Sequence, residues 1–391
     1  MLIGEKMKKI YYIGYYSDND SDKNRKAAPS ADTKISYIIE SLNNIGYDVE
    51  VISFCEENSR NRIIKKYDEY DINEKSHKVH FFKTYTSKYR IIRVIGRWFT
   101  WLSQKKYIQK NCLNEECKII IYHSLGLLKL LKFLNRKNKK YILEMEEIYA
   151  DVINNNKIRQ KEIKLAKMAS SYIFPTNLLD EKINTEKKPS VIIHGTYKTE
   201  KMTNKKIFNE EKKEIHCVYA GTFDARKGGC TAAVAVAEYL PPNYHIHILG
   251  FGSEEEVEKI KKIIKQTEKK SKAKVTFEGV LQGEEYMNFI QNCQIGLSTQ
   301  NPDAQFNATS FPSKILSYMA NGLRVVSARI PVVEQSDIGK MIYYYNEQKP
   351  QMIAKTIMNI DMNDKYDSRS IIKELSKKFE REIEEMLRKV K

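Results

Sequence analysis

The chain has 391 residues, enough for two domains that each bury a core. Its 41% hydrophobic and 10% aromatic content excludes a disordered composition, and no run of about 18 apolar residues predicts a transmembrane helix. A formal net charge of +17 predicts attraction to polyanions: nucleic acid, anionic lipid or nucleotide-activated substrates. Nucleic acid is the least favoured of these, because the sequence has no zinc-finger, leucine-zipper or RNA-recognition signature.

The N-terminal segment predicts a strand rather than a signal peptide. Basic residues precede the short apolar run Ile10–Tyr15, but no small-residue cleavage site follows it. The six cysteines are scattered without a Cys-x-x-Cys pair, and no histidine cluster accompanies Cys112 and Cys117. We therefore expect reduced cysteines in a cytoplasmic protein, and no zinc or other metal site.

Apolar strand-like runs alternate with helical periodicity along the whole chain, which predicts parallel α/β domains. Strands of the first half are expected at Ile10–Tyr15, Val49–Phe54, Val79–Phe82, Lys118–Tyr122, Lys140–Leu143, Ser171–Phe174 and Ser190–Ile193. A polar, charged segment, 197–214, marks a domain boundary. Strands of the second half are expected at Ile215–Ala220, His245–Leu249, Lys274–Phe277, Gln294–Ser298, Leu323–Ser327 and Met341–Tyr345.

We predict an N-terminal domain, 1–195, and a second domain, 196–370, with parallel sheets facing a central cleft where ligands meet the strand ends. Helices are expected at Ile35–Ile45, Glu254–Lys270 and Ile371–Val390.

In the first domain, three groups of polar residues could line a site. His123 follows an apolar strand, so its side chain is expected at a strand's carboxyl end, as an active-site or a structural residue. Glu146 and Glu147 follow the next strand and could supply a general base or bind acceptor hydroxyls, or could form a solvated helix start. Arg25 and Ser30, in the loop after the first strand, could contact an acceptor or a diphosphate.

Residues 83–110 contain eight basic residues and no acidic one. On a helical wheel, Arg90, Arg93 and Arg97 lie opposite an apolar face made of Ile91, Ile95, Trp98, Phe99 and Leu102. Such a helix suits an anionic membrane surface, with 88–110 as the contact. The alternative is a surface helix that packs its aromatic residues into the first domain.

In the second domain, three strand-to-helix turns carry glycine at strand ends. The first, 218–229, contains Gly221, Thr222 and Lys227; the alternative to a ligand site here is a tight turn with solvated cations. The second, 245–252, has Gly250 ahead of an N-capped helix. The third, 275–285, contains Gly279 and Val280.

Residues 307–327 are the most informative stretch. A helix opens at Ser310–Ser313 and ends at Asn321–Gly322, and an apolar strand follows. Its first-turn N–H groups form an anion site, and Lys314 in that turn gains nothing from the helix dipole. This is consistent with an anionic ligand such as phosphate; the alternative, a solvated surface lysine in a lysine-rich protein, stays open on local chemistry alone.

This segment resembles the donor-site loop and helix of the GT-B glycosyltransferases, especially family 4 and its capsule and exopolysaccharide relatives. It keeps Phe311-Pro312-Ser313-Lys314, Tyr318-Met319-Ala320, Gly322 and Val325-Val326 of the family pattern. The family's two glutamates fall on Thr309 and Ser317. The three glycine turns precede the segment in the family's order.

The resemblance implies a GT-B fold, with the C-terminal helix 371–391 crossing back onto the acceptor-side N-terminal domain, and roles for particular residues. Phe311, Ser313, Lys314 and Lys227 would hold the donor diphosphate, with Thr222 where many members have arginine. Gly221 and Gly250 would lie at the donor, and Gly279 and Val280 near the nucleobase. His123 would face the donor sugar, and Thr309 and Ser317 would offer neutral hydrogen bonds in place of carboxylates.

We therefore expect a metal-independent glycosyltransferase of the hexosyl type. It would move a sugar from a nucleotide sugar, expected to be UDP-linked and with no further cofactor, to a glycan or lipid-linked acceptor in surface polysaccharide biosynthesis. It would act in the cytoplasm, peripherally at the inner membrane face. Two alternatives stay open: an inactive accessory subunit of a partner transferase, and a GT-B sugar-nucleotide epimerase.

Overall fold

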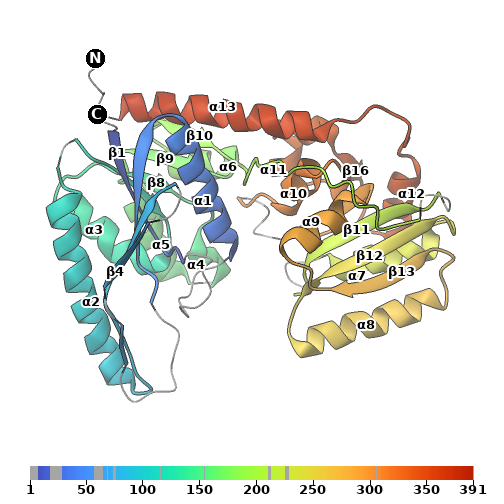
Figure 1. The fold of residues 1–391 in the computed structure, drawn as a ribbon, viewed down its shortest axis with the longest axis horizontal. Helices are drawn as coiled ribbons and strands as arrows, with labels where there is room; N and C mark the ends of the chain where they lie inside the picture. The colour runs from blue at the N-terminus through green and yellow to red at the C-terminus, as the bar shows by residue number, and fades with distance from the viewer. Residues whose placement is uncertain are drawn as a thin grey trace. The chain divides into compact units, whose positions relative to one another are not determined.

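A computed structural model of the chain describes residues 8–17, 29–56, 65–67, 69–73, 76–114, 116–153, 155–209, 213–224, 229–304, 307 and 309–390. The chain forms two compact units (Figure 1). Unit 1 comprises Met1–Ile193 and Lys378–Lys391, and unit 2 comprises His194–Lys377.

Unit 1 is built around one large sheet. Its strands are β1 (Lys8–Gly14), β2 (Tyr47–Ser53), β4 (Tyr70–Asn73), β5 (Lys78–Phe81), β7 (Lys118–Tyr122), β8 (Ile142–Glu144), β9 (Ser171–Phe174) and β10 (Ser190–Ile192). They lie in the order β10-β9-β8-β7-β1-β2-β5-β4, and a separate ribbon pairs β3 (Lys65–Tyr67) with β6 (Thr84–Thr86). Its helices include α1 (Pro29–Asn44), α2 (Arg90–Asn111), α3 (Leu128–Arg136), α4 (Tyr149–Val152), α5 (Asn156–Ala166) and α6 (Asn177–Ile183).

The strands expected from the sequence of unit 1 all form, and their neighbours pair in parallel. One strand that was not expected, the edge strand β4, pairs with β5 antiparallel, with Tyr70 opposite Phe81. Its connection to β5 is only four residues long, too short for the crossover that a parallel pair requires. The short strands β3, β4 and β6 were not predicted.

Unit 2 has a wholly parallel six-stranded sheet. Its strands are β11 (Ile215–Thr222), β12 (Tyr244–Phe251), β13 (Lys274–Gly279), β14 (Ile295–Ser298), β15 (Arg324–Ala328) and β16 (Tyr343–Tyr345), in the order β13-β12-β11-β14-β15-β16. Its helices include α7 (Cys230–Ala235), α8 (Glu254–Glu268), α9 (Gly283–Gln291), α10 (Lys314–Ala320), α11 (Pro331–Glu334) and α12 (Pro350–Met358). Each strand expected from the sequence forms here, and α8 begins with the predicted cap, a reciprocal bond pair between Ser253 and Glu256.

The segment that follows unit 1 in the sequence is bound to unit 2 through α9. Two side chains at the end of that helix, Gln291 and Asn292, both donate hydrogen bonds to the backbone of the segment and accept hydrogen bonds from it. The Gln291 amide accepts from Thr203 N at 2.6 Å and donates to a neighbouring carbonyl, and the Asn292 amide accepts from Ile207 N at 3.1 Å. The segment is polar in sequence but ordered along the described stretch 197–209.

The final helix, α13 (Ser368–Lys389), ends in unit 1. Within that unit Phe379 stacks on Tyr37 of α1, with centroids 6.1 Å apart, and Glu380 accepts from the Asn44 amide at 2.7 Å. Along its exposed side, Lys378 and Arg388 pair with glutamates one turn away.

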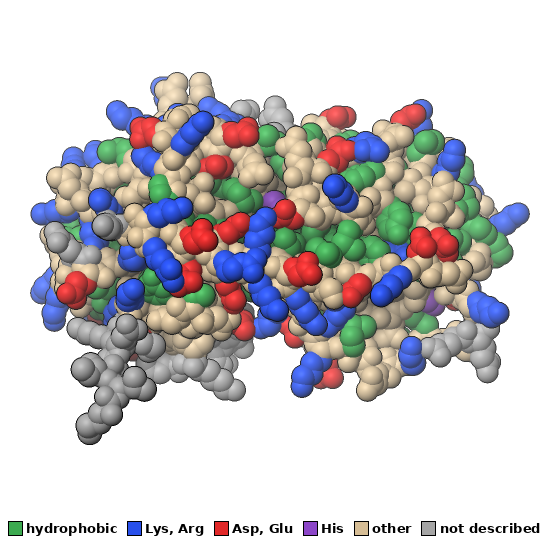
Figure 2. All heavy atoms as spheres, turned by 90° about the horizontal axis from the view of Figure 1, so that it is seen from above, with side chains coloured by type: hydrophobic (Ala, Val, Ile, Leu, Met, Phe, Trp, Pro, Cys, Tyr) green, Lys and Arg blue, Asp and Glu red, His purple; other side chains and the backbone are tan. Residues whose placement is uncertain are grey.

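Basic and acidic side chains are interspersed on the face shown in Figure 2, so the net positive charge does not form a single field there.

Candidate functional site

Both sheets have the strand order of a doubly wound nucleotide-binding fold. In unit 2 the order reads 3-2-1-4-5-6, and the order reverses between β11 and β14. In unit 1 the strands β1, β2, β5, β7, β8 and β9 repeat this order, which reverses between β1 and β7. Ligands of such sheets bind outside the carboxyl ends of the strands at the reversal, called the switch point here.

Lys314 lies at the switch point of unit 2. It is the first residue of α10, and its Nζ lies 4.1 Å from the ring centroid of Tyr219 on β11. The same Nζ lies 3.0 Å from the position that a Cβ on Gly221 would take. Burial lowers the pKa of Lys314 to about 8, and no carboxylate within the described residues forms an ion pair with it. The half-buried cation would therefore be stabilised by an incoming anion.

Two facing glycines form the floor beside Lys314. Gly221 and Gly250 are register partners at the ends of β11 and β12, and Gly250 has a φ of +150°. A Cβ on Gly250 would lie 1.8 Å from the carbonyl oxygen of Gly221, so no side chain fits between the strands. This close approach leaves bare backbone at the switch point.

The helix α10 is held on this floor by its own side chains. The hydroxyl of Tyr318 accepts from Ala220 N at 2.8 Å, which ties α10 to the end of β11. Helix α10 ends, as predicted, at Asn321 and Gly322, where φ is +88°. The predicted helix thus forms, and its first residue lies beside the strand end.

The other predicted residues of the second domain lie around α10 or at strand ends. Phe311 is buried and stacks on His194, with centroids 4.6 Å apart, whereas Ser313 is exposed at the position before α10. Thr309 and Ser317 are both partly exposed.

Gly279 ends β13 with a φ of +74°, and Val280 after it is 55% exposed. The hydroxyl oxygen of Thr222 accepts a hydrogen bond of 3.2 Å from the backbone N–H of Asp224. Lys227, expected at the diphosphate, lies outside the described residues.

His123 follows β7 at the switch point of unit 1, as expected from the sequence. Its side chain is enclosed: the residue is 1% exposed, and its ring stacks on Tyr149 with centroids 5.6 Å apart. Nε2 lies 3.5 Å from Oε1 of Glu162, whose carboxylate accepts from the N–H groups of Tyr149 and Ala150 at 2.9 Å each. Burial lowers the pKa of His123 to about 4, so the imidazole is neutral at pH 7.

A buried carboxylate lies next to His123. Glu144 ends β8, is fully buried, and accepts a hydrogen bond from the Tyr12 hydroxyl. Burial raises the pKa of Glu144 to about 8, against the opposing charge of Lys34. Lys34 itself pairs with Glu146 and donates to Ile193 O at 3.3 Å. The acidic residues within 144–147 are therefore partly interior, and the alternative of a wholly solvated helix start is wrong for them.

The remaining predicted residues of unit 1 are placed as follows. Glu147 is partly buried, and Ser30 is exposed on α1. Arg25 lies outside the described residues.

Helix α2 faces outward with its apolar side. Its buried residues are Gly96, Thr100, Gln104 and Ile108, spaced one turn apart. The apolar residues are exposed instead: Tyr89, Ile91, Val94, Ile95, Trp98, Phe99 and Leu102. A Cβ on Gly96 would lie 2.6 Å from Cβ of Tyr85, so the helix packs on β6 through its smallest residue. The interpretation that the aromatic residues pack into the domain is wrong for Trp98 and Phe99, although Trp101 and Tyr107 on the same helix do pack against its core.

Sequence reasoning did not single out Lys34, Glu162 or Tyr219. A signal existed for two of them. Lys34 precedes Ile38 and Leu42 by one and two turns on the buried face of α1, and Glu162 shares a buried face with Leu165 and Ala166 on α5. A charged residue inside an apolar stripe indicates a buried pair, whereas Tyr219 reads as an ordinary strand residue.

The comparison with known proteins agrees with this geometry. Residues 214–361 match the family model of glycosyl transferases group 1. The predicted resemblance is thus confirmed over this stretch of unit 2. No curated protein matches the chain in sequence.

Solved structures match nearly the whole chain at low identity. HepE from Anabaena, in complex with UDP, is 13% identical with a TM-score of 0.65, over 97% of this chain and 100% of that one. The lipopolysaccharide outer core galactosyltransferase WaaB, in its apo form, is 14% identical with a TM-score of 0.59, over 97% and 99%. The pneumococcal O-GlcNAc transferase GtfA, in complex with UDP and GlcNAc, is 12% identical with a TM-score of 0.60, over 98% of both chains. These likenesses establish the GT-B fold, as predicted.

Proposed function

We propose that the protein is a glycosyltransferase that takes a sugar from a UDP-sugar bound to unit 2. The single observation that carries this proposal is Lys314: a half-buried ammonium group at the switch point, beside bare backbone and without a carboxylate partner among the described residues. The match of residues 214–361 to glycosyl transferases group 1 supports it, as do the UDP complexes of HepE and GtfA.

The reaction breaks the bond between the anomeric carbon and a diphosphate oxygen and forms one to an acceptor hydroxyl oxygen, which loses its proton. The leaving UDP gains negative charge. In this proposal Lys314 would offset that charge and Lys227 would assist it, so the transfer of a hexosyl group would need no metal at the diphosphate. Gly221 and Gly250 would let the diphosphate approach the backbone. Thr309 and Ser317 would bond sugar and ribose hydroxyls in place of the family's glutamates.

Unit 1 would bind the acceptor, a glycan or a lipid-linked glycan of surface polysaccharide biosynthesis. Glu146 and Glu147 would bond acceptor hydroxyls. His123 would act as a positioning residue, because its buried ring supports Tyr149 and the turn that Glu162 caps.

Binding of UDP tests the donor site. Lys314→Met should weaken UDP binding about 10- to 100-fold, because a hydrogen bond to a charged group contributes about 1.5–3 kcal/mol. The matched control is Lys340→Met, an exposed lysine of the same unit with the same change in charge. Isothermal titration calorimetry with UDP compares the affinities of the two variants. Equal affinities for UDP would overturn the assignment of the donor site.

A second candidate function is an accessory subunit that binds UDP-sugar or a partner without transferring sugar. The presence of Thr309 and Ser317 in place of two carboxylates favours it. Incubation with UDP-sugars and membrane extracts separates the two: release of UDP that depends on acceptor supports the transferase. A UDP-sugar of altered stereochemistry without transfer would indicate an epimerase.

We further propose that α2 places the protein on an anionic membrane surface at the cytoplasmic face. Ile91 is 75% exposed and Trp98 and Phe99 are each more than half exposed, on a helix with basic residues. Such side chains enter the headgroup region, and the exposed lysines of the same segment, Lys88, Lys106 and Lys110, would contact anionic lipid, at about 1 kcal/mol each. In the part of the chain that the structure describes, no helix is long and apolar enough to span a bilayer.

Vesicle co-sedimentation tests this surface. The wild type should bind vesicles containing phosphatidylserine and lose binding as salt rises. Trp98→Glu with Phe99→Glu should abolish binding, whereas Tyr239→Glu with Met358→Glu, two exposed apolar residues of unit 2, should leave it intact. Absence of binding at low salt would refute the membrane contact.

A further inference from the structure

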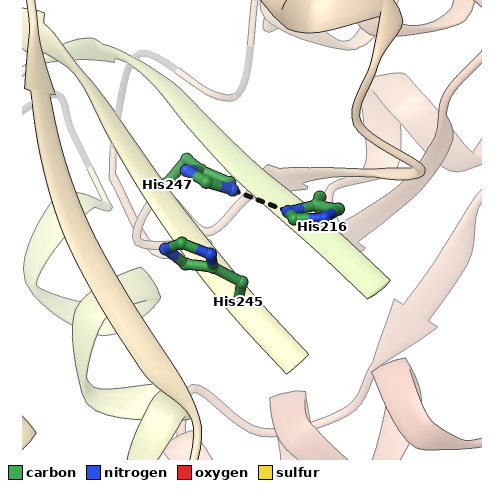
Figure 3. Close-up of side chains that lie close together, drawn as sticks. All are labelled: His216, His245 and His247. Atoms are coloured by element: carbon green, nitrogen blue, oxygen red, sulfur yellow. Dashed lines mark hydrogen bonds between the residues drawn. The ribbon is translucent and has the colours of Figure 1, made fainter. Parts of the chain in front are cut away.

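Three of the seven histidines lie together at the other end of the unit 2 sheet from Lys314. His216 lies near the start of β11, and His245 and His247 lie near the start of β12 (Figure 3). His216 and His245 are register partners, and His245 and His247 are two residues apart. Since alternate residues of a strand share a face and partners of a parallel pair point the same way, the three imidazoles lie on one face.

Their nitrogens are close enough to share an ion. One nitrogen of each histidine lies within 4.8 Å of the others, and Nδ1 of His216 lies 2.9 Å from Nε2 of His247. In a tetrahedral zinc site with Zn–N bonds of 2.0–2.1 Å, the ligand nitrogens are about 3.3 Å apart. The pair would open by a few tenths of an ångström and His245 would move inward. His245 is partly exposed, and to turn toward the ion its ring would give up the 3.0 Å hydrogen bond between Nε2 and Thr276 Oγ1.

The surroundings match those of metal-binding histidines. Nδ1 of His247 lies 2.8 Å from Oε1 of Glu278, which fixes the proton on Nδ1 and leaves the lone pair of Nε2 for the cluster. A carboxylate behind a ligating imidazole orients the ring and raises its basicity. Glu214 Oε2 lies 3.8 Å from Nδ1 of His245 and also pairs with Lys274. Burial, aided by the neighbouring imidazoles, lowers the pKa of His216 and His245 to about 4, so both are neutral at pH 7.

The cluster is enclosed on one side and accessible on another. Phe208 stacks on His216, with centroids 3.8 Å apart, and on His247 at 4.9 Å. An adjoining cavity of about 140 Å³, lined by Phe208, Glu214 and His216 among others, reaches the cluster at His216.

We propose that His216, His245 and His247 bind a divalent transition-metal ion of the Zn²⁺ class. Imidazole nitrogens are ligands that such an ion prefers, and Glu214 and Glu278 offset part of its charge. The ion would join β11 to β12 at the amino ends of the strands, away from Gly221 and Gly250. Its role is therefore structural for unit 2, and it is independent of the proposed donor site.

Metal titration of the full-length protein tests the site. After removal of metal with a chelator, the protein should bind one equivalent of Zn²⁺ in competition with a chromophoric chelator, and Co²⁺ should give the intense visible absorption of a tetrahedral nitrogen site. Binding should also raise the melting temperature, because the ligand binds only the folded state. Failure to bind either ion at about 1 μM or tighter overturns the proposal.

Variants assign the binding to the cluster. His216→Gln with His247→Gln should weaken Zn²⁺ binding at least 100-fold, and His77→Gln, a buried histidine of unit 1, should leave it unchanged. Should the double variant fail to fold, His245→Gln at the partly exposed position should still lower the affinity about tenfold or more. Imidazole ¹⁵N shifts of the wild type give the same assignment without any substitution. Equal affinity in the cluster variants and in His77→Gln, or unchanged imidazole shifts, overturns it.

Discussion

The two switch points have the same strand order but opposite chemistry. In unit 2 the strand ends are bare backbone, Gly221 and Gly250, beside a cation that has no described carboxylate partner. In unit 1 the corresponding place is filled by side chains: Glu144 and His123 are both buried, and burial shifts the pKa of each toward its neutral form. The topology thus places the site, and the residues at the strand ends decide whether it attracts an anion.

The largest effect that would sharpen this contrast is on stability. Gly250→Ala should lower the free energy of unfolding by about 2–4 kcal/mol, because its Cβ would overlap the carbonyl of Gly221. Gly46→Ala in unit 1 is the control: its φ is +87° but nothing lies within 4 Å of the new Cβ, so about 1–2 kcal/mol is expected. Urea unfolding measures both. Equal losses would mean that the backbone contact in unit 2 is unimportant.

The pH dependence of UDP binding comes next. The pKa of Lys314 is about 8 in the free protein, and an anion would raise it. Below pH 8 the lysine is charged before UDP binds, but above pH 8 binding must take up a proton. The dissociation constant should therefore rise by up to about tenfold per pH unit above pH 8.

Titration calorimetry between pH 7 and 9, in buffers of different ionisation enthalpy, measures both the affinity and the proton uptake. Lys314→Met should show neither the slope nor the uptake. An identical slope in this variant would place the titrating group elsewhere.

In unit 1 the corresponding pH effect is on stability. The folded-state pKa of Glu144, about 8, is above the usual 4.5, so the folded protein retains a proton that the unfolded chain releases. The stabilisation is complete below pH 4.5 and is lost as the pH rises through 8. Wild-type stability should fall between pH 6.5 and 8, whereas Glu144→Gln should be flatter over this range. Urea midpoints across the range test it, with Glu186→Gln, an exposed glutamate of unit 1, as the control.

His123 should give a pH effect on stability of the opposite sign. Its folded-state pKa of about 4 is below the usual 6.5, so the unfolded chain binds the extra proton and stability rises with pH between 4 and 6.5. His123→Gln should reduce that rise, by at most about 1.4 kcal/mol per pH unit. Unfolding midpoints at pH 4.5 and 6.5 measure it. A rise unchanged by the substitution would indicate that His123 is not buried as a neutral ring.

Most of the fold followed from periodicity, since each predicted strand of both sheets forms. The strands that were missed, β3, β4 and β6, are three or four residues long and mostly polar or aromatic, so no alternation distinguishes them from loops. Helix α2 shows a second limit. The apolar face was predicted, but the choice between outward and inward stayed open, because the residues that show which side docks, Gly96, Thr100, Gln104 and Ile108, are mostly small or polar.

The candidate sites divide in the same way. Lys314 and the glycines of unit 2 were predictable because strand ends and turn glycines are local in sequence. Glu144 could be counted as an acidic residue, but its burial depends on Tyr12 from a distant strand. The expectation of no zinc site came from cysteine spacing. The histidine cluster depends on the register that places His216 opposite His245, which only the assembled sheet supplies.

The segment after unit 1 has one more consequence, for proteolysis. Its lysines, including Lys201 and Lys205, would make it an obvious cleavage site for trypsin if no hydrogen bonds constrained its backbone. Their own carbonyls, however, accept hydrogen bonds from Gln291 and Asn292 at 3.0 and 2.9 Å. A protease must draw several residues into an extended conformation, so these bonds have to open first. The amide side chains at the end of one short helix thereby protect a stretch whose composition alone suggests an exposed linker.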